Sequence, residues 1–401
     1  MAYDLSKLLV VGISSTALFN LEEETRIFDS KGLSSFISYQ REHEDENLKP
    51  GSAFPLVKGL LALNTKLGVR KVEVILMSKN HPDVSLRVFN SIRNHGLDMK
   101  RAALTGGAPL GPYLAPFGIG LFLSQDAADV QSAANQGVAA GLIYSPPPEL
   151  DLPTGPIRIA FDGDCVIFSD EAQEVYEKKG LEAFSEYEEG NAKKELPAGP
   201  FAKLLRFLSE IQTPDPNTSP IRVALVTDRN MPTHERVIRT LRAWNVRMDE
   251  AFFLGGIPKH GILSAFGAHM FFDDKEEHCK SAADKVPTGQ VFRPAKEHHE
   301  IELGVSVEVG VGDGGERSLL VICKSYLKRD YSANEAKLKR WYQEKILDWP
   351  EKNRSALLEE LEESAKGTPQ GDERRASAEV DTPESKLMAF LENLALKHRP
   401  K

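Results

Sequence analysis

Short apolar runs alternate with amphipathic stretches along the first 300 residues of the chain. The clearest apolar runs are Ile157–Phe161, Val223–Val226, Ala251–Leu254 and Met270–Phe272. Each is short and bounded by polar residues, which is typical of buried β-strands. Between them, Phe201–Ile211 and Glu235–Trp244 carry apolar residues at helical spacing. Strands alternating with helices predict an α/β fold with a doubly wound, Rossmann-like parallel sheet, whose sites lie at the carboxyl ends of the strands.

One further apolar run, Leu8–Ile13, follows Lys7 near the beginning of the sequence. A secretion signal would need a longer apolar segment with stronger flanking signals. We therefore interpret this run as another buried strand.

The sequence repeats itself at a nearly constant offset. A shift of 149 residues lays Val74–Asp126 on Val223–Lys275 without a gap, and a shift of 148 pairs Lys31-Gly32-Leu33 with Lys179-Gly180-Leu181. Identical pairs include Arg87/Arg236, Gly106/Gly255, Gly107/Gly256, Pro109/Pro258, Phe117/Phe266 and Phe122/Phe271. Two copies of one domain, at about 1–150 and 151–300, explain this match.

Other segments depart from the repeated pattern. The stretch from about 169 to 220 is rich in Glu and Lys and predicts a mostly helical cap over the second copy. Beyond residue 300 we predict a C-terminal extension (301–365) with a strand at Ser318–Ser325 and a helix at Ser332–Leu347, a disordered linker (366–385), and a terminal helix at Lys386–Leu396 in 386–401.

The composition is that of a soluble globular protein. Of its 401 residues, 41% are hydrophobic and 27% are charged, which does not call for a membrane span. The three cysteines are widely spaced, which favours a reducing compartment, and we predict a cytoplasmic location. A net charge of -9 without a dense basic stripe argues against long nucleic acids as partners, although a small anion could still bind in a local pocket.

Two carboxylates follow the strand Ile157–Phe161, in the order Asp162-Gly163-Asp164. One carboxylate can attack phosphorus while the other transfers the proton of the leaving group, and a divalent cation can screen the repulsion between nucleophile and phosphate. An acidic turn without function is the alternative for this motif taken alone.

Three more polar features follow later strands in order. Thr227 suits a phosphate oxygen, Lys259 after Gly255-Gly256 suits the charge of a transferring phosphoryl group, and Asp273-Asp274 suit Mg²⁺. Taken singly, each has a simpler explanation, namely a helix cap, a solvated charge or a capped loop.

The order of these four features resembles the haloacid dehalogenase superfamily. Over roughly residues 8–295 the chain also resembles the cytosolic 5'-nucleotidase type I family, in stretches that include Tyr39–Lys58, Ala160–Glu171 and Phe271–Asp274. This resemblance implies Mg²⁺-dependent dephosphorylation of nucleoside 5'-monophosphates such as AMP. It implies that Asp162 is the nucleophile and that Asp164 is the general acid and base.

The same resemblance implies the remaining roles. Thr227 and Lys259 would hold the phosphate, while Asp162, the backbone carbonyl of Asp164, and one or both of Asp273 and Asp274 would hold the metal. A nucleoside phosphotransferase using the same site, and a non-enzymatic nucleotide-sensing protein, remain alternatives. Assembly into a homo-oligomer is left open.

The first copy lacks the charged residues of this set. The offset aligns Asp162 with Ile13, Asp164 with Ser15, Thr227 with Ser78, Lys259 with Leu110, and Asp273-Asp274 with Ser124-Gln125. We therefore predict a catalytically degenerate domain that keeps the fold. Its loops, with Ser78, Lys79, Asn80, Gly106 and Gly107, are candidates to contact a nucleotide effector or the substrate base; the alternative is a packing role.

Two arginines and three histidines are further candidates for function. Arg229 and Arg236 lie close enough after Thr227 to reach phosphate or base, but Arg236 matches Arg87 of the inert copy, which favours a structural role. His278, His298 and His299 have no metal-ligand spacing with a carboxylate or thiol, and we interpret them as surface residues.

Overall fold

The computed structural model describes residues 4–150, 152–215 and 218–295. The predictions for 301–401 and for His298 and His299 lie outside these residues. No helix in the described part is long and apolar enough to cross a bilayer. We call residues 4–150 the first half and residues 152–295 the second half.

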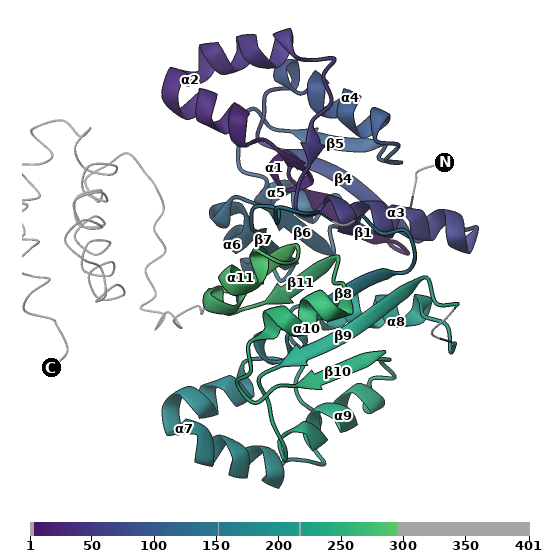
Figure 1. Cartoon of the computed structure of the whole chain (residues 1–401), viewed down its shortest axis with the longest axis vertical. Coiled ribbons are helices and arrows are strands. Elements are labelled where there is room, and N and C mark those ends of the chain that lie inside the picture. Colours follow the sequence, from purple (N-terminus) through teal and green to yellow (C-terminus); the bar gives the residue numbers. More distant parts are fainter. Residues whose placement is uncertain (1–3, 151, 216–217, 296–401) are drawn as a thin grey trace, which may run out of the picture. The chain divides into compact units, whose positions relative to one another are not determined.

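A single ten-stranded sheet runs through both halves (Figure 1), in the order β10-β9-β8-β11-β12-β7-β6-β1-β4-β5. The strands of the first half are β1 (Leu9–Ile13), β4 (Val72–Ser78), β5 (Arg101–Leu104), β6 (Leu121–Ser124) and β7 (Ala139–Ile143). Those of the second half are β8 (Ile157–Phe161), β9 (Ile221–Thr227), β10 (Glu250–Phe253), β11 (Met270–Asp273) and β12 (Thr288–Val291). The α/β class with a mainly parallel sheet is therefore confirmed.

Both halves have the same strand order when each is followed from its outer edge to the centre of the sheet. In the ten-stranded sheet, all neighbouring strands within each half are parallel, and β7 and β12, where the halves meet, pair antiparallel. Each half consequently has its own edge at which the carboxyl ends of its strands lie, and therefore its own place for a site.

Most predicted strands are present with small shifts of their bounds. β8 has the predicted bounds, and β1 begins one residue later than predicted. β10 begins one residue earlier than the predicted run and is only partly buried, because it lies at the edge of the sheet. β12 was missed, since its sequence TGQV contains no apolar run. A small second sheet pairs β2 (Phe19–Asn20) with β3 (Lys49–Pro50).

Helices cover both faces of the large sheet. The first half contains α1 (Ser15–Leu18), α2 (Glu22–Glu42), α3 (Phe54–Leu67), η1 (Pro82–Val84), α4 (Leu86–Asn94), α5 (Gly111–Leu114) and α6 (Ala127–Asn135). The second half contains η2 (Gly163–Ile167), α7 (Glu171–Gly190), α8 (Ala202–Ile211), α9 (His234–Ala243), α10 (Lys259–Phe266) and α11 (Glu276–Ala283).

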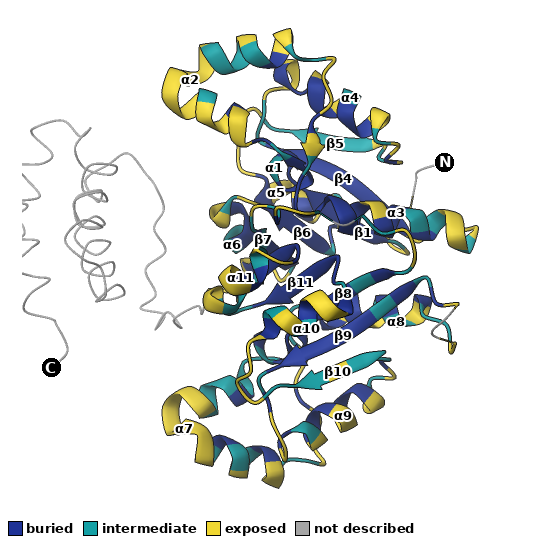
Figure 2. Ribbon diagram, viewed as in Figure 1, coloured by how far each residue is buried: buried dark blue, intermediate teal, exposed yellow. Residues whose placement is uncertain are grey.

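The core is divided by the two faces of the sheet. Apolar residues of α3, α4, α8 and α9 form one large cluster, whereas α5 and α6 in the first half and α10 and α11 in the second form two smaller clusters. Alternate strand residues supply the two sides: Val11 belongs to the large cluster and Val10 to a smaller one. Figure 2 shows this pattern, with buried strands between helices that are exposed on their outer sides.

The segment predicted as a cap contains two helices with different surroundings. Leu204, Leu205 and Leu208 of α8 are buried in the large core cluster, so this helix belongs to the body of the fold. The helix α7 has a kink at Gly180 (φ 83°), and α2 has a matching kink at Gly32 (φ 77°). Figure 1 shows α2 and α7 at opposite ends of the described region. Only α7 is left as a candidate cap.

Close packing of small residues joins the two halves at β7 and β12. A Cβ atom placed on Gly289 would lie 2.9 Å from the ring of Phe272 and 3.1 Å from Ile143 Cδ1. Gly141 faces the same ring from β7, where a Cβ atom would lie 3.2 Å from it. The seam therefore has no room for a larger residue at Gly289.

We expect Gly289→Ala to lower the free energy of unfolding by about 1–3 kcal/mol, because overpacking forces Phe272 and Ile143 to shift. Gly155→Ala is the matched control, since a Cβ atom there meets nothing within 4 Å. Urea denaturation of both variants checks this, and equal stabilities would contradict the tight seam.

Candidate active site

The chain turns sharply directly after β8. The backbone N–H of Asp162 donates to the carbonyl of Phe272 on β11 at 2.8 Å, and the next residues form η2 with Cys165 at φ 63°. Gly163 allows close approach to β9, since a Cβ atom there would lie 3.3 Å from Thr227 Oγ1. The turn thus brings Asp162 and Asp164 beside the carboxyl end of the neighbouring strand.

A buried lysine connects two of the predicted carboxylates. Lys259, the first residue of α10, donates from Nζ to Asp162 Oδ1 and to Asp273 Oδ2, both at 2.7 Å. All three side chains are almost fully buried. Burial of unpaired charges is costly, so the ammonium and the two carboxylates depend on one another.

The pKa shifts at this site follow from burial and charge. Burial raises the pKa of Asp162, and Asp273 and Asp274 add to this shift against the opposing effect of Lys259. For Lys259, burial acts to lower the pKa, but Asp162 and Asp273 outweigh it and hold the pKa above its usual value. The lysine therefore remains a cation.

Three carboxylates meet closely enough to share a metal ion. Asp162, Asp273 and Asp274 each offer an oxygen, and these oxygens lie within 4.8 Å of one another. Burial and the neighbouring Asp273 raise the pKa of Asp274, which reflects the repulsion within the group. A hard divalent cation bound by these oxygens would relieve this repulsion, so the donor set fits Mg²⁺.

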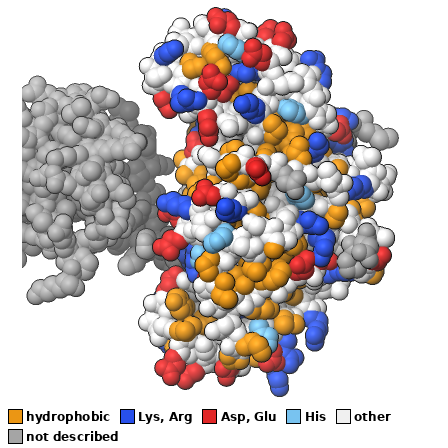
Figure 3. All heavy atoms as spheres, viewed as in Figure 1, with side chains coloured by type: hydrophobic (Ala, Val, Ile, Leu, Met, Phe, Trp, Pro, Cys, Tyr) orange, Lys and Arg blue, Asp and Glu red, His pale blue; other side chains and the backbone are white. Residues whose placement is uncertain are grey.

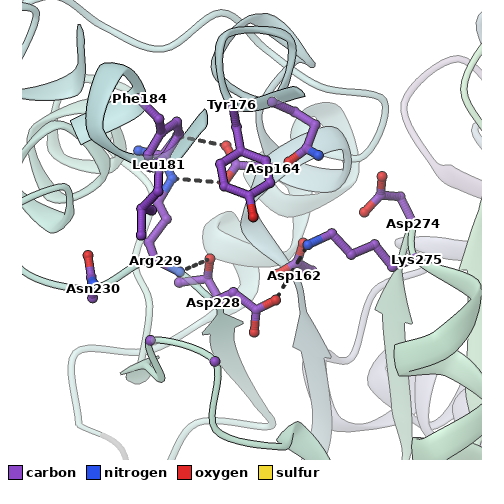
Figure 4. Close-up of a pocket in the computed structure, with 14 residues that line it drawn as sticks. Asp162, Asp164, Tyr176, Leu181, Phe184, Asp228, Arg229, Asn230, Asp274 and Lys275 are labelled. Atoms are coloured by element: carbon purple, nitrogen blue, oxygen red, sulfur yellow. Dashed lines mark hydrogen bonds and ion pairs between the residues drawn. The ribbon is translucent and has the colours of Figure 1, made fainter. Parts of the chain in front are cut away.

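The side chain of Asp164 lies outside this group and is bound by an arginine instead. Arg229 donates from Nε to Asp164 Oδ2 at 2.8 Å and from Nη2 to Asp164 Oδ1 at 2.7 Å, and Figure 4 shows this pair beside the pocket. Arg229 also pairs with Glu188 of α7 and lies over the ring of Phe184, 5.3 Å from its centroid. Asp164 is thereby tied to α7 through Arg229.

Arg236 extends the network on its other side. Its guanidinium donates to Glu188 Oε1 at 2.7 Å and to Glu171 Oε1 at 3.0 Å, and its side chain is fully buried. This agrees with the structural role predicted for Arg236. Arg229, predicted as a possible phosphate or base contact, is committed to Asp164 and Glu188 in this structure.

The interpretation of His278 as a surface residue is wrong. Its Nδ1 lies 3.1 Å from Asp273 Oδ2, and its Nε2 lies 3.3 Å from Asp228 Oδ2. The side chain is partly buried because the first turns of α11 bring it back over the end of β11. Spacing in the sequence gave no signal for this contact, since Asp273 lies five residues earlier and before the helix begins.

A pocket of about 260 Å³ opens beside these groups. Its lining residues are Asp162, Asp164, Gln173, Tyr176, Leu181, Phe184, Thr227, Asp228, Arg229, Asn230, Gly255, Gly256, Asp274 and Lys275. Figure 4 shows the apolar side chains of α7 (Tyr176, Leu181 and Phe184) together at one side, with Asp162 and Asp274 away from them. The pocket therefore combines a charged end with an apolar wall.

Comparison with known proteins identifies the family. The family model of the 5'-nucleotidases matches residues 1–298. The chain belongs to the 5'-nucleotidase family. It is 35% identical over 287 residues to human cytosolic 5'-nucleotidase 1B, in an alignment that covers 68% of this chain. Both matches support the cytosolic type I branch that the sequence resembles.

The coverage of that relative is partial, because the alignment spans 47% of its length. The chain thus corresponds to about half of the human 5'-nucleotidase. No solved structure matches the chain.

In this member of the 5'-nucleotidase family, the fold gathers the residues that the sequence singled out. Asp162, Lys259, Asp273 and Asp274 lie together, and Asp162, Asp164, Thr227 and Asp274 line one pocket. Their roles stay predictions. Sequence reasoning missed Glu188, Asp228 and Lys275; the last two directly follow residues that were predicted, whereas Glu188 carries no local motif and is found only through its three-dimensional contacts.

We expect Glu188→Gln to lower the free energy of unfolding by about 3 kcal/mol, because Arg229 and Arg236 would lose the carboxylate buried between them. Glu182→Gln on the exposed side of the same helix is the matched control and should change stability by less than about 0.5 kcal/mol. Urea denaturation compares the two. An equally small effect of both substitutions would show that the buried network is not needed for folding.

Proposed function

We propose that this 5'-nucleotidase family member is a Mg²⁺-dependent phosphohydrolase that removes phosphate from nucleoside 5'-monophosphates such as AMP. The observation that carries the proposal is the buried Lys259 between Asp162 and Asp273, with Asp274 close enough to share a metal ion. A carboxylate beside a cation site and an ammonium group suits nucleophilic attack on a phosphate. The similarity to human cytosolic 5'-nucleotidase 1B supports the same activity and a cytoplasmic location.

The reaction proceeds in two displacements on Asp162. A carboxylate oxygen of Asp162 attacks phosphorus, the bond from phosphorus to the 5'-oxygen breaks, and this oxygen takes a proton from the carboxyl group of Asp164. Water then attacks the phosphorus of the aspartyl-phosphate, Asp164 takes back a proton, and inorganic phosphate leaves. Thr227 and Lys259 bind the phosphate oxygens in both steps.

Asp164 has to change partners during this cycle. Both oxygens of its carboxylate accept hydrogen bonds from the Arg229 guanidinium. To donate a proton, the Asp164 side chain rotates from Arg229 toward the leaving oxygen. Because Arg229 also binds Glu188, a movement of α7 over the substrate would release Asp164, which is the cap role that we propose for this helix.

Asp162, Asp273 and Asp274, with the backbone carbonyl of Asp164, would hold the metal ion. When bound, Mg²⁺ supplies positive charge that screens the phosphate from the carboxylate that attacks it. The ammonium group of Lys259, which contacts Asp162, also screens the phosphate from the attacking carboxylate. Its contact with Asp273 keeps it in place.

We also propose that the two halves are copies of one haloacid-dehalogenase-type domain, of which the first has lost its chemistry. The identical strand order and the matching kinks at Gly32 and Gly180 support this proposal. The loops of the first half that carry Ser78, Lys79, Asn80, Gly106 and Gly107 contact an effector or the substrate base in this scheme. Assembly into a homo-oligomer stays a prediction.

We expect Asp162→Asn to reduce phosphate release from AMP by roughly a thousandfold or more, because the neutral amide cannot act as the nucleophile. Asp284→Asn, the same substitution at an exposed position after α11, is the control and should keep the full rate. A phosphate-release assay measures both. Turnover of Asp162→Asn near the unmodified rate would rule out the proposed nucleophile.

We expect chelation with EDTA to stop phosphate release and excess Mg²⁺ to restore it, because three clustered carboxylates would otherwise repel the substrate phosphate. Asp274→Asn should raise the Mg²⁺ concentration needed for half-maximal rate, since one oxygen ligand loses its charge. A full rate in EDTA would show that the acidic group does not serve the reaction.

A further inference from the structure

The first half contains a pocket lined by residues of α2 that is larger than the proposed substrate pocket of the second half. We call it the α2 pocket. Its volume is about 690 Å³, and it is lined by Thr16, Leu21, Glu24, Thr25, Phe28, Leu33, Phe36, Ile37, Gln40, Lys79, Asn80, His81, Asp83, Val84, Gly106 and Gly107. A second pocket of about 490 Å³ shares Thr16, Thr25, Lys79 and Asn80 with it and adds the hydroxyls of Ser14, Ser15, Ser78 and Ser124. Together they give an apolar chamber beside a hydroxyl-rich one.

The apolar wall of the α2 pocket repeats that of the proposed substrate pocket. At the offset of 148 residues, Phe28, Leu33 and Phe36 correspond to the α7 residues Tyr176, Leu181 and Phe184. The outer aromatic pairs also have the same geometry. The rings of Phe28 and Phe36 are 5.8 Å apart at 84°, and those of Tyr176 and Phe184 are 6.1 Å apart at 85°. The part of the pocket suited to an aromatic base is therefore present in both halves.

The part suited to phosphate is present only in the second half. The positions of Asp162, Lys259 and Asp273 hold Ile13, Leu110 and Ser124 in the first half, so it has neither the nucleophile nor the buried ammonium. The position of Asp164 holds Ser15, whose hydroxyl lies 3.1 Å from that of Ser78. Hydroxyls and apolar side chains thus take the place of the charged groups.

The charge around the α2 pocket also disfavours an anion. Lys79 is the only Lys or Arg among the described residues that line the two pockets, and its Nζ is bound by Asp126 at 2.7 Å and Asp129 at 3.0 Å. Burial opposes but does not cancel the effect of these hydrogen bonds, which raise the pKa of Lys79. The positive charge of the Lys79 ammonium is therefore balanced by the carboxylates of Asp126 and Asp129. Figure 3 shows charges of both signs interspersed over the visible face, without a large basic patch.

Gln40 supplies a polar group without a partner. Its side chain is 2% exposed, and neither its amide nitrogen nor its amide oxygen has a hydrogen-bond partner among the described residues. The corresponding residue of the second half is Glu188, which pairs with both Arg229 and Arg236. A buried amide that makes no hydrogen bond destabilises the fold, because its desolvation is not compensated. A ligand that offers a donor and an acceptor side by side would recover this cost.

From these features we infer that the first half binds an uncharged nucleoside, which is the dephosphorylated product of the proposed reaction. Its base lies against Phe28 and Phe36 with a polar edge toward Gln40, and its sugar hydroxyls face Ser14, Ser15 and Ser78. The inference rests on the proposed function, because the matching wall in the second half is assigned there to a nucleoside monophosphate. The nucleoside released at the active site of the second half would thus bind to the pocket of the first half.

Calorimetric titration of the full chain with adenosine, in the same EDTA buffer that prevents hydrolysis in the AMP titration below, tests this site. Phe28 is 47% exposed, so Phe28→Ala should fold, and Tyr176→Ala is its matched counterpart in the second half. We expect Phe28→Ala to weaken one adenosine-binding event by about tenfold or more, since base–aromatic stacking contributes on that scale. Tyr176→Ala should leave that event unchanged. A Phe28→Ala titration that matches the unmodified protein would overturn the inference.

The Gln40→Met variant tests whether the Gln40 amide binds the ligand or only stabilises the fold. Removal of an unpartnered amide should raise the melting temperature, while the lost hydrogen bonds should weaken adenosine binding. Unchanged adenosine affinity would contradict the role of Gln40. In EDTA, AMP should bind the Phe28-dependent site more weakly than adenosine does. Tighter binding of AMP at that site would overturn the preference for an uncharged ligand.

A phosphate-release assay with AMP on the same unmodified protein tests the proposed function independently of the nucleoside site. Hydrolysis of AMP without a Phe28-dependent adenosine site would reject the nucleoside site alone. Failure of the unmodified protein to release phosphate from AMP would reject the proposed function, whatever the titration with adenosine shows.

Discussion

Burial of the Lys259 ammonium between the carboxylates of Asp162 and Asp273 is the interaction on which the proposed chemistry depends. Burial acts against the charged form of all three groups, the lysine acts to lower the pKa of both carboxylates, and the two carboxylates hold the pKa of the lysine above its usual value. Asp162 directly follows β8, Asp273 ends β11 and Lys259 begins α10, so Asp162 is distant in sequence from the other two. The parallel sheet brings the ends of these strands together, and the Gly163 turn leaves room for the approach of β9.

The first half has the same sheet but lacks this buried ion pair. In the first half the same positions carry Ile13, Leu110 and Ser124, and the sheet is kept in the same strand order without a charged residue at any of the three. The charged set of the second half is therefore not needed to build the sheet. This favours a chemical explanation for it, and it leaves the first half free to serve a different ligand.

The sequence predicted much of the fold because its strongest signals are local. Runs such as Ile157–Phe161 mark strands by themselves, and the repeat predicted that two similar halves exist. The antiparallel joint of β7 and β12 could not be predicted, since β12 has no apolar run and its neighbour is distant in the chain. Nor could one continuous sheet be distinguished from two separate ones, because the pairing depends on packing around Phe272, Gly141 and Gly289.

The candidate site was predicted in its composition but not in its contacts. Strand ends located Asp162, Thr227 and Asp273, since parallel strands place their ends at one edge. The pairing of Arg229 with Asp164 and the position of His278 near Asp273 were missed, because both depend on side-chain directions that no spacing reveals. The orphan amide of Gln40 is likewise visible only in three dimensions.

Mass spectrometry of protein quenched in acid during turnover of AMP tests the central claim most directly. The account predicts one phosphoryl group on the peptide that contains Asp162, and it predicts that this group disappears when AMP is exhausted. Steady phosphate release with a phosphoryl group on another residue, or with Asp162 unmodified throughout turnover, would contradict the account.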